Sequence, residues 1–392
     1  MKRILLALCA LVPLCASAQY NPDIMTTDLS SATLRQEIVL PKKVNGYNIY
    51  KADLHVHTIY SDGAMTPAYR IEEAYWDGLD IIAITDHMEY RRIEQLALQF
   101  LRGYTGGEPL KSENDRIITK PATERGILVN LNYSVQEAQK AAKKWGVLVI
   151  PSIEITREPV KIGHYNALFT TDNNAIYDPD PAQAMRNAKK QGALIMHNHP
   201  GWRRTSCDKT EFEQQIYQEG LIDGIEVVNG RQIYPKVVSR AKEDNIFVAS
   251  TTDIHSPTAW IFDRVGHLRN MTFVLAEECT LESIREALKE RRTLAYSAGY
   301  IFGDEELLLE FFHASISCRV VDFDKKKGYT LELRNNTSLP FQISRGKGTI
   351  HTIKPFHTIR QTVGAKATVA KFDIRSMMYG ASKHPVAEFP LQ

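Results

Sequence analysis

The sequence predicts an α/β barrel followed by a small all-β domain, and three features of the chain support this fold class. From Tyr47 to about Ser297, short apolar, strand-like runs alternate with helix-like stretches. After about Gly303 the pattern changes to short strands punctuated by Gly and Pro. The length of 392 residues also suits one large domain plus a small one better than a single ordinary domain.

The first part of the chain alternates strands and helices regularly. This alternation implies a parallel sheet, and the number of units implies closure into a barrel. Several helical stretches end in Gly, the usual left-handed stop. The strand candidates are 48–57, 79–85, 146–155, 164–170, 192–199, 224–229, 245–251, 271–276 and 291–297. The helix candidates include 66–78, 134–146, 180–192, 208–220 and 280–292. The stretch 101–128 has few apolar periods and is predicted to be an insertion over one barrel mouth.

The last ninety residues predict strands only. Apolar and polar residues alternate over 329–334, after a Lys-rich turn closed by Gly328. Similar short strands follow at 341–344, 349–353, 357–363 and 367–376. We therefore expect the barrel to occupy residues 46–302 and a sandwich-like all-β domain to occupy 303–392.

The N-terminus has the composition of an export signal. A basic start, MKR, precedes the apolar run ILLALCALVPLC and the small residues Ala16-Ser17-Ala18. This pattern predicts a signal peptide over 1–18, cleaved after Ala18, and an N-terminal extension over 19–45. A lipoprotein with lipidated Cys15 is less favoured because bulky Leu14 precedes the cysteine. No later segment has the roughly 18 continuous apolar residues of a membrane span. The prediction is a periplasmic or secreted protein.

Charge and cysteine content exclude several classes of function. Lys and Arg total 48 against 46 Asp and Glu, so no basic field favours nucleic acid. The mature chain keeps Cys207, Cys279 and Cys318, an odd and scattered set without a C-x-x-C motif. This is not a disulfide framework.

Seven of the twelve histidines lie on five short segments, nearly all at the C-terminal end of a predicted strand. A single buried histidine is more often a hydrogen-bonded core residue than a ligand. The C-terminal ends of barrel strands, however, converge on one mouth. The histidines are His55, His57, His87, His164, His197, His199 and His255, and the carboxylates at matching places are Asp62, Glu154 and Asp253. Of these, His164 is the exception, because it begins a strand.

The spacing of these residues predicts a metal site. Strand residues i and i+2 share a face, so His55 and His57 project together, and so do Asp253 and His255. Imidazole and carboxylate are ligands for zinc, manganese and iron. Several imidazoles crowded into one mouth would repel or stay unpaired without a metal. We therefore expect divalent transition metal ions here.

The chain resembles the polymerase-and-histidinol-phosphatase (PHP) family in six motifs that occur in the family's order. They are DLHVHTIYSDG, AITDH, PSIEI, GH before a strand, HNHPG and TTDIH, within roughly residues 46–300. The resemblance implies a distorted (β/α)7 barrel, a site for two or three metals, and phosphoesterase activity.

The resemblance also implies a ligand set, residue by residue. His55, His57, Glu154 and Asp253 match the ligands of a first metal. Glu154 would bridge to a second metal held by His164 and by His199, which precedes Pro200. Asp62, His87 and His255 match the ligands of a third. Some family members have another histidine where this chain has Asp62, so the occupancy of the third position stays open.

Other residues near the mouth are candidates for supporting roles. Asp53 is predicted to share the face of His55 and to orient an imidazole. His197 is a candidate acid for protonating the leaving oxygen, and Glu154 is the bridging catalytic group. Arg203, Arg204 and Arg231 follow strand ends and are candidate phosphate ligands. A solvated surface position is the alternative for each arginine.

Together these observations predict metal-assisted hydrolysis of a small phosphate mono- or diester. One alternative is an amidohydrolase-like enzyme acting on amides or lactones, which usually bridges its metals with a carboxylated lysine. Another is a metal- or carbohydrate-binding protein without activity. DNA processing is disfavoured by the export signal and by a net charge of only +2, and histidinol phosphate hydrolysis by the cytoplasmic location of that biosynthesis. The sequence leaves the alcohol of the ester, the native metal and the oligomeric state open.

Overall fold

A computed structural model describes residue 23 and residues 35–91, 130–156, 160–262 and 268–391. The predicted signal peptide and the predicted insertion over 101–128 lie outside these residues. No helix in the described ranges has both the length and the apolar character needed to cross a membrane.

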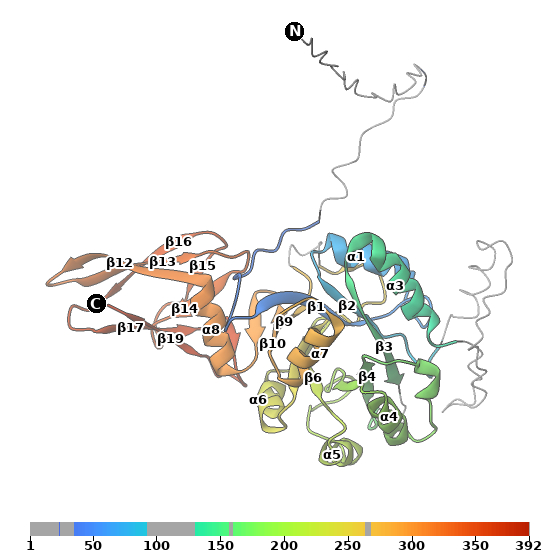
Figure 1. The fold of residues 1–392 in the computed structure, drawn as a ribbon. Helices are drawn as coiled ribbons and strands as arrows, with labels where there is room; N and C mark the ends of the chain where they lie inside the picture. Colours follow the sequence, from blue (N-terminus) through green and yellow to red (C-terminus); the bar gives the residue numbers. More distant parts are fainter. Residues whose placement is uncertain (1–22, 24–34, 92–129, 157–159, 263–267, 392) are drawn as a thin grey trace, which may run out of the picture. The chain divides into compact units, whose positions relative to one another are not determined.

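One large sheet forms the barrel (Figure 1). Its order is β18-β11-β10-β9-β1-β2-β3-β4-β5-β6-β7, with β8 paired to β6. The barrel strands are β1 (Asn48–Val56), β2 (Ile81–Ile84), β3 (Leu148–Thr156), β4 (His164–Leu168), β5 (Leu194–His197), β6 (Gly224–Asn229) and β8 (Phe247–Thr251). The flanking strands are β7 (Gln232–Ile233), β9 (Met271–Ala276), β10 (Thr293–Ser297), β11 (Tyr300–Phe302) and β18 (Met377–Met378).

Seven of these strands make a ring. The path runs from β1 through β6 to β8, and a parallel bridge between Val56 and Ile254, just past β8, returns it to β1. The predicted distorted (β/α)7 barrel is therefore confirmed. β9 extends the sheet from β1 outside the ring, in antiparallel orientation.

The prediction of a parallel sheet was too simple, because β4 runs antiparallel to both β3 and β5. The connection from β3 to β4 has only seven residues, 157–163. A parallel crossover needs a dozen or more, so this short connection forces an antiparallel pair.

Helices pack around the ring, and most begin at a side-chain cap. Thr66, Asp180, Thr280 and Asp304 each accept a hydrogen bond from a first-turn backbone N–H, and Thr210 forms a full capping box with Glu213. The helices are α1 (Pro67–Trp76), α3 (Tyr133–Trp145), α4 (Pro181–Lys190), α5 (Glu211–Gln218), α6 (Pro235–Glu243), α7 (Leu281–Lys289) and α8 (Glu305–Ser315). Because α8 covers 305–315, this part of the predicted all-β domain is helical.

Side chains fill the barrel interior to contact distance. Gly224 begins β6, and a Cβ there would lie 2.2 Å from the ring of Phe247 on β8. Only glycine leaves room for this buried phenylalanine, so the motif GIEVVN begins with glycine for packing.

The C-terminal strands form two small antiparallel sheets. One has the order β12-β13-β16 and the other β15-β14-β17-β19. The first consists of β12 (Ile316–Asp324), β13 (Gly328–Asn335) and β16 (Thr358–Val363), and the second of β14 (Phe341–Ser344), β15 (His351–Ile353), β17 (Val369–Ile374) and β19 (Val386–Pro390). These sheets confirm the predicted β-rich C-terminal part.

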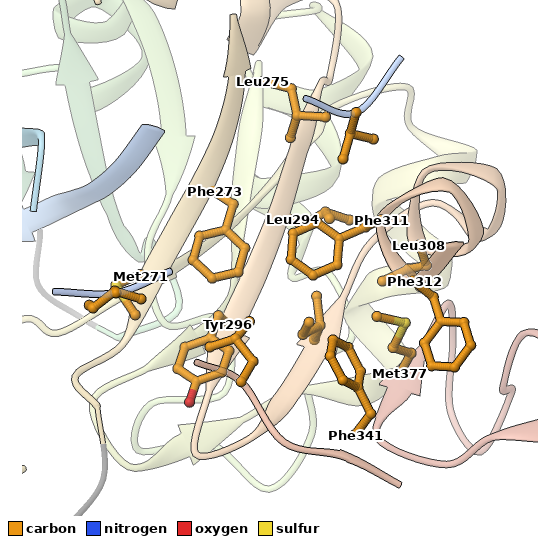
Figure 2. Close-up of a cluster of buried hydrophobic side chains, with 14 of the residues drawn as sticks. Met271, Phe273, Leu275, Leu294, Tyr296, Leu308, Phe311, Phe312, Phe341 and Met377 are labelled. Carbon is orange, nitrogen blue, oxygen red and sulfur yellow. The ribbon is translucent and has the colours of Figure 1, made fainter. Parts of the chain in front are cut away.

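The barrel and the C-terminal sheets share one hydrophobic core (Figure 2). On α8, Phe311 stacks on Phe273 of β9 with ring centroids 5.7 Å apart. Its neighbour Phe312 meets Phe341 of β14 edge-to-face at 5.4 Å. β18, from the C-terminal part, pairs with β11 of the large sheet. Helix α8 therefore joins two regions into one packed unit.

This shared core predicts that Phe341→Ala destabilises the barrel as well as the small sheets. Phe341 is fully buried, and removing a buried phenylalanine costs about 3–5 kcal/mol. Phe323→Ala is the matched control, because Phe323 is 48% exposed on β12. In urea unfolding followed by circular dichroism, Phe341→Ala should lower the midpoint of a single transition, while the control stays near wild type. Separate unfolding of the barrel at its wild-type midpoint would contradict the shared core.

Candidate metal centre

The predicted ligands gather at one end of the barrel. His55, His57, His87 and Glu154 lie at or just past the ends of β1, β2 and β3. His199 follows β5, and Asp253 and His255 follow β8. The apparent exception, His164, has a topological explanation. Because β4 runs antiparallel, its first residue lies at the same barrel end as the last residues of β3, and His164 pairs in register with Thr156.

β1 has a register irregularity beside its histidines. Asp53 pairs with Ile82, whereas Val56 pairs with Ile84, so β1 holds one extra residue between them. Such a bulge shifts the alternation of side chains. The carboxylate of Asp53 accepts from the backbone N–H of His55 at 3.3 Å, from Thr252, and from Arg269 Nη2 at 2.6 Å. None of these described contacts is to an imidazole, so they do not support the predicted role of Asp53 in orienting one.

In the described part of the chain, ligand-type atoms form three overlapping groups, and the atoms of each group lie within 4.8 Å of one another. Glu154 belongs to two of these groups and His57 to two. The groups are His55, His57 and Glu154; Glu154, His164 and His199; and His57, Asp62, His87 and His255. Asp253 adjoins the first group, with Oδ1 at 3.2 Å from His55 Nε2 and 3.0 Å from His57 Nε2.

Glu154 is the centre of the arrangement. It is fully buried, and its oxygens lie 3.4–3.8 Å from ring nitrogens of four histidines, His55, His57, His164 and His199. A fifth nitrogen, His87 Nδ1, lies 2.5 Å away. The two oxygens of this one carboxylate thus lie beside five candidate ligands, and the described contacts of Glu154 leave out Asp62, Asp253 and His255.

Several buried polar atoms in these groups lack a hydrogen bond. No hydrogen bond of regular geometry reaches Glu154 Oε2, Asp62 Oδ1 or His164 Nε2 among the described residues, although His87 Nδ1 lies 2.5 Å from the first atom and His255 Nε2 lies 3.1 Å from the second. The Nε2 atoms of His55 and His57 face each other at 3.1 Å. A buried polar atom without a partner costs about 1–3 kcal/mol. Cations held between these atoms would satisfy them, so the donor set fits divalent metal ions.

The charges of the site agree with this interpretation. Burial raises the pKa of Glu154, but the charges of His87 and His55 and hydrogen bonds from His164 and His199 outweigh it and hold the pKa well below the usual range. Burial disfavours charge on His87, yet Glu154 and Asp62 raise its pKa to about 10. Burial and the neighbouring His255 and His87 lower the pKa of His57 to about 4. The carboxylates of the site are therefore ionised and need nearby positive charge. Protons on the histidines and bound metal ions are alternative sources of that charge, so they compete for the same ligand atoms.

Two of the candidate ligands have unusual backbone conformations. His199 has φ of 27° and Asp253 has φ of 50°, in the left-handed region that non-glycine residues rarely adopt. Hydrogen bonds hold both residues there. The N–H of His199 donates to Glu226 at 2.5 Å, and that of Asp253 donates to the carbonyl of His55 at 2.9 Å. Strain of this kind is typical of functional sites.

The sequence analysis missed Glu226, on β6. This fully buried carboxylate accepts from His55 Nδ1 at 2.8 Å, from Thr251 Oγ1 at 2.6 Å and from Asn229 Nδ2 at 2.9 Å, besides the His199 N–H. It fixes the His55 ring so that Nε2 points to the groups described above. The only sequence signal was an acid inside the apolar strand GIEVVN.

Asn198 was also missed, although it lies between two of the candidates. Its Nδ2 donates to Glu154 Oε1 at 2.8 Å and to Asn166 Oδ1 at 2.9 Å. These contacts fix the orientation of the central carboxylate.

The loop after β1 explains the SDG motif. Asp86 accepts from the backbone and hydroxyl of Thr58 and from Ser61 Oγ, at 2.7–2.8 Å. A Cβ on Gly63 would lie 2.7 Å from the carbonyl of His57. Glycine is therefore required for the close turn that brings Asp62 to His255, at 3.1 Å.

The ring of His197 contacts helix α5 and not the three ligand groups. Its Nδ1 bonds Tyr217 Oη at 2.9 Å, and its Nε2 lies 3.4 Å from Glu213, both on α5. Burial also lowers its pKa. Both ring nitrogens are thus engaged with a helix, and this geometry does not support the predicted role of His197 as a proton donor.

The three candidate arginines differ in their surroundings. Arg204 donates to the buried Glu213 at 2.6 Å, which occupies its guanidinium. Arg203 is exposed, and its guanidinium lies 4.3 Å above the ring of Trp202. That ring lies 5.2 Å from His164 and 5.3 Å from His199, so Arg203 is the arginine held near the ligand groups. Arg231 is exposed beside β6.

A protein-family model for the PHP domain matches residues 53–312. The chain belongs to the PHP family. It is also similar to a crystal structure of a two-domain protein from Bacteroides vulgatus that contains a predicted PHP-like metal-dependent phosphoesterase. The identity is 32%, the TM-score is 0.78, and the match covers 91% of this chain and 99% of that one. This PHP relative therefore shares the C-terminal part as well as the barrel.

A weaker likeness is to an amidohydrolase from Chromobacterium violaceum, with bound sulfate and no metal. Its identity is 16%, its TM-score 0.35, and the match covers 53% of this chain and 88% of that one, so it carries no argument. No curated protein matches this PHP chain.

We predict that Glu226→Gln weakens metal binding while leaving the protein folded. Glu226 presents two acceptor oxygens to four donor groups, whereas glutamine would present only one. Loss of such a supporting carboxylate typically lowers metal affinity 10–100-fold. Titration of metal-free protein with Zn²⁺ against a competing chelator measures this loss. Glu332→Gln, in the C-terminal β13, is the control. Unchanged affinity in Glu226→Gln would show that the ring of His55 is held by other contacts.

Proposed function

We propose that this PHP-family chain is a metal-dependent phosphoesterase that hydrolyses a small phosphate mono- or diester. The observation that carries the proposal is the buried carboxylate of Glu154. It lies beside five histidines, and its Oε2 atom has no hydrogen bond of regular geometry among the described residues. A site built to hold several dications beside one another suits a phosphoryl group, which is anionic, better than a neutral amide.

The proposed ligand assignment follows the three groups. His55, His57, Glu154 and Asp253 hold a first ion, and Glu154, His164 and His199 hold a second. Asp62, His87 and His255 hold a third, with His57 close enough to join them. The imidazole and carboxylate donors suit zinc, manganese or iron. The third group is the most open, because the side chain of His255 is 39% exposed.

Metal ions bound there would supply Lewis-acid stabilisation of the phosphoryl oxygens and acidify the attacking water. The protein's own residues supply the rest. Glu154 bridges two groups and fixes their separation, while Glu226 and Asn198 keep His55 and Glu154 in place. Arg203 is the proposed side chain for a phosphoryl oxygen, since Arg204 is ion-paired with Glu213. Arg231 remains a candidate for a more distant part of the substrate.

We further propose that the protein is exported. This part rests on the sequence of residues 1–18 alone, with its basic start, apolar run and small residues before the cleavage position. An exported phosphoesterase would act on substrates outside the cytoplasm and would not need to bind nucleic acid.

Metal content is the first test of this proposal. Protein purified without chelator should contain at least two equivalents of transition metal per chain by elemental analysis. The three overlapping ligand groups are the reason for this number. A value below one, with no gain on reconstitution, would exclude the proposed centre.

The second test is the reaction. The metal-loaded protein should release p-nitrophenol from a phosphate mono- or diester, lose this activity on chelation and regain it with Mn²⁺ or Zn²⁺. Inorganic phosphate should inhibit competitively, because it resembles the product. Glu154→Gln should abolish turnover in a folded protein, whereas Glu332→Gln should not change it. Cleavage of lactones or amides and of no phosphoester would favour the amidohydrolase alternative.

A further inference from the structure

Arg70 is a fully buried arginine to which the proposed chemistry assigns no part. It lies on α1, is 1% exposed, and is among the largest fully buried side chains of the described residues. The same face of α1 buries Ile71 and Ala74. Burial of a guanidinium in such surroundings is costly unless hydrogen bonds and a counter-ion compensate it. The position of an arginine here therefore requires an explanation.

The guanidinium of Arg70 donates hydrogen bonds to backbone carbonyls of two chain segments. Nε donates to the carbonyl of His57 at 2.9 Å. Nη2 donates to the carbonyl of Ile254 at 3.1 Å and Nη1 to that of Ser256 at 2.9 Å. The counter-ion is Glu73, at 2.7 Å from Nη1.

Glu73 in turn anchors the second segment. Its other oxygen accepts from the N–H of Thr258 at 2.7 Å. The Arg70–Glu73 ion pair of α1 is therefore hydrogen-bonded to the segment 254–258 through both of its members. Arg70 is also hydrogen-bonded to His57 at the end of β1.

These two segments meet where the barrel ring closes. Backbone pairing is sparse there. The described contacts are the bridge between Val56 and Ile254 and two hydrogen bonds, His57 N–H to Ile254 at 3.2 Å and Asp253 N–H to His55 at 2.9 Å. The other strand pairs of the ring range from two residue pairs, between β5 and β6, to five, between β3 and β4 and between β6 and β8, so the single bridge of this junction is the shortest backbone pairing described in the ring. We call the junction of 55–57 with 253–256 the seam.

Candidate ligands stand on both sides of the seam. His55 and His57 come from β1, and Asp253 and His255 come from the other side. The rings of His57 and His255 stack with centroids 4.2 Å apart. Ligands of one ion must keep their positions to within about 0.5 Å. A small opening of the seam would separate them.

We propose that Arg70 is a positioning residue that sets the spacing of the two ligand-bearing segments across the seam. This inference rests on the metal centre of the proposed function. Arg70 touches no candidate ligand side chain in the contacts described. It acts through the carbonyls of His57, Ile254 and Ser256. A lysine could not replace it, because a single ammonium cannot span three carbonyls and a carboxylate in this planar fork geometry.

The test compares Arg70→Lys with wild type in the titration of metal-free protein with Zn²⁺ against a competing chelator. The dissociation constant of at least one ion should rise 10–100-fold. Phe341→Leu is the control, because it loosens the core at β14, far in the topology from the seam. Wild-type affinity in Arg70→Lys would overturn the inference, and so would an equal loss in Phe341→Leu.

Chemical rescue adds a readout that general instability would not give. Millimolar guanidinium should restore Zn²⁺ affinity to Arg70→Ala, and potassium should not.

If the Arg70 variants do not fold, hydrogen exchange of the wild-type protein decides. Helix α1 holds no candidate ligand, so metal loading should slow amide exchange over 67–76 only if α1 is coupled to the seam. Unchanged exchange in α1, with protection at 253–256, would overturn the inference and leave the metal centre intact. Wild-type protein that binds no metal would instead remove the proposed function and this inference with it.

Discussion

The site depends on one buried carboxylate surrounded by imidazoles. Glu154 is charged in a place that water does not reach, and burial alone would keep it protonated. Positive charge from its surroundings is what holds it ionised. The same requirement explains why so many histidines point to it, and why a carboxylate oxygen and an imidazole nitrogen remain without hydrogen bonds.

The scaffold supports this charge by fixing its neighbours. Glu226 holds the ring of His55 and the strained backbone of His199, and Asn198 holds Glu154 itself. β1 has a bulge beside its two buried histidines, His55 and His57. Each of these features lies beside a candidate ligand or holds one in place. The regular parts of the barrel serve packing, as Gly224 under Phe247 shows.

Much of the fold was predictable because strands and helices differ in the spacing of their apolar residues, which can be seen in short stretches of the sequence. The nine predicted strands up to residue 297 all form, and the six motifs place the candidate ligands at one barrel end. The direction of β4 was not predicted, since it depends on the length of a connection and not on the residues of the strand. The bulge in β1 was not visible either, because it arises from pairing with β2. The roles of Glu226 and Arg70 required the tertiary structure, as an isolated acid in a strand or an arginine in a helix has no local signature. His197 is the converse case: it lies two residues before His199 in the sequence, but its ring nitrogens contact Tyr217 and Glu213 of α5, so its place in the sequence did not reveal its surroundings.

The reversed direction of β4 has a consequence for how the site assembles. Glu154 and His164 lie on one hairpin, so these two candidate ligands meet through contacts of low sequence separation. His55 and Asp253, by contrast, meet only when the first and last strands of the ring come together. Loop-closure entropy penalises the second kind of contact far more than the first. The two halves of the centre therefore differ in contact order: one is encoded in a local supersecondary unit, and the other exists only in the closed topology.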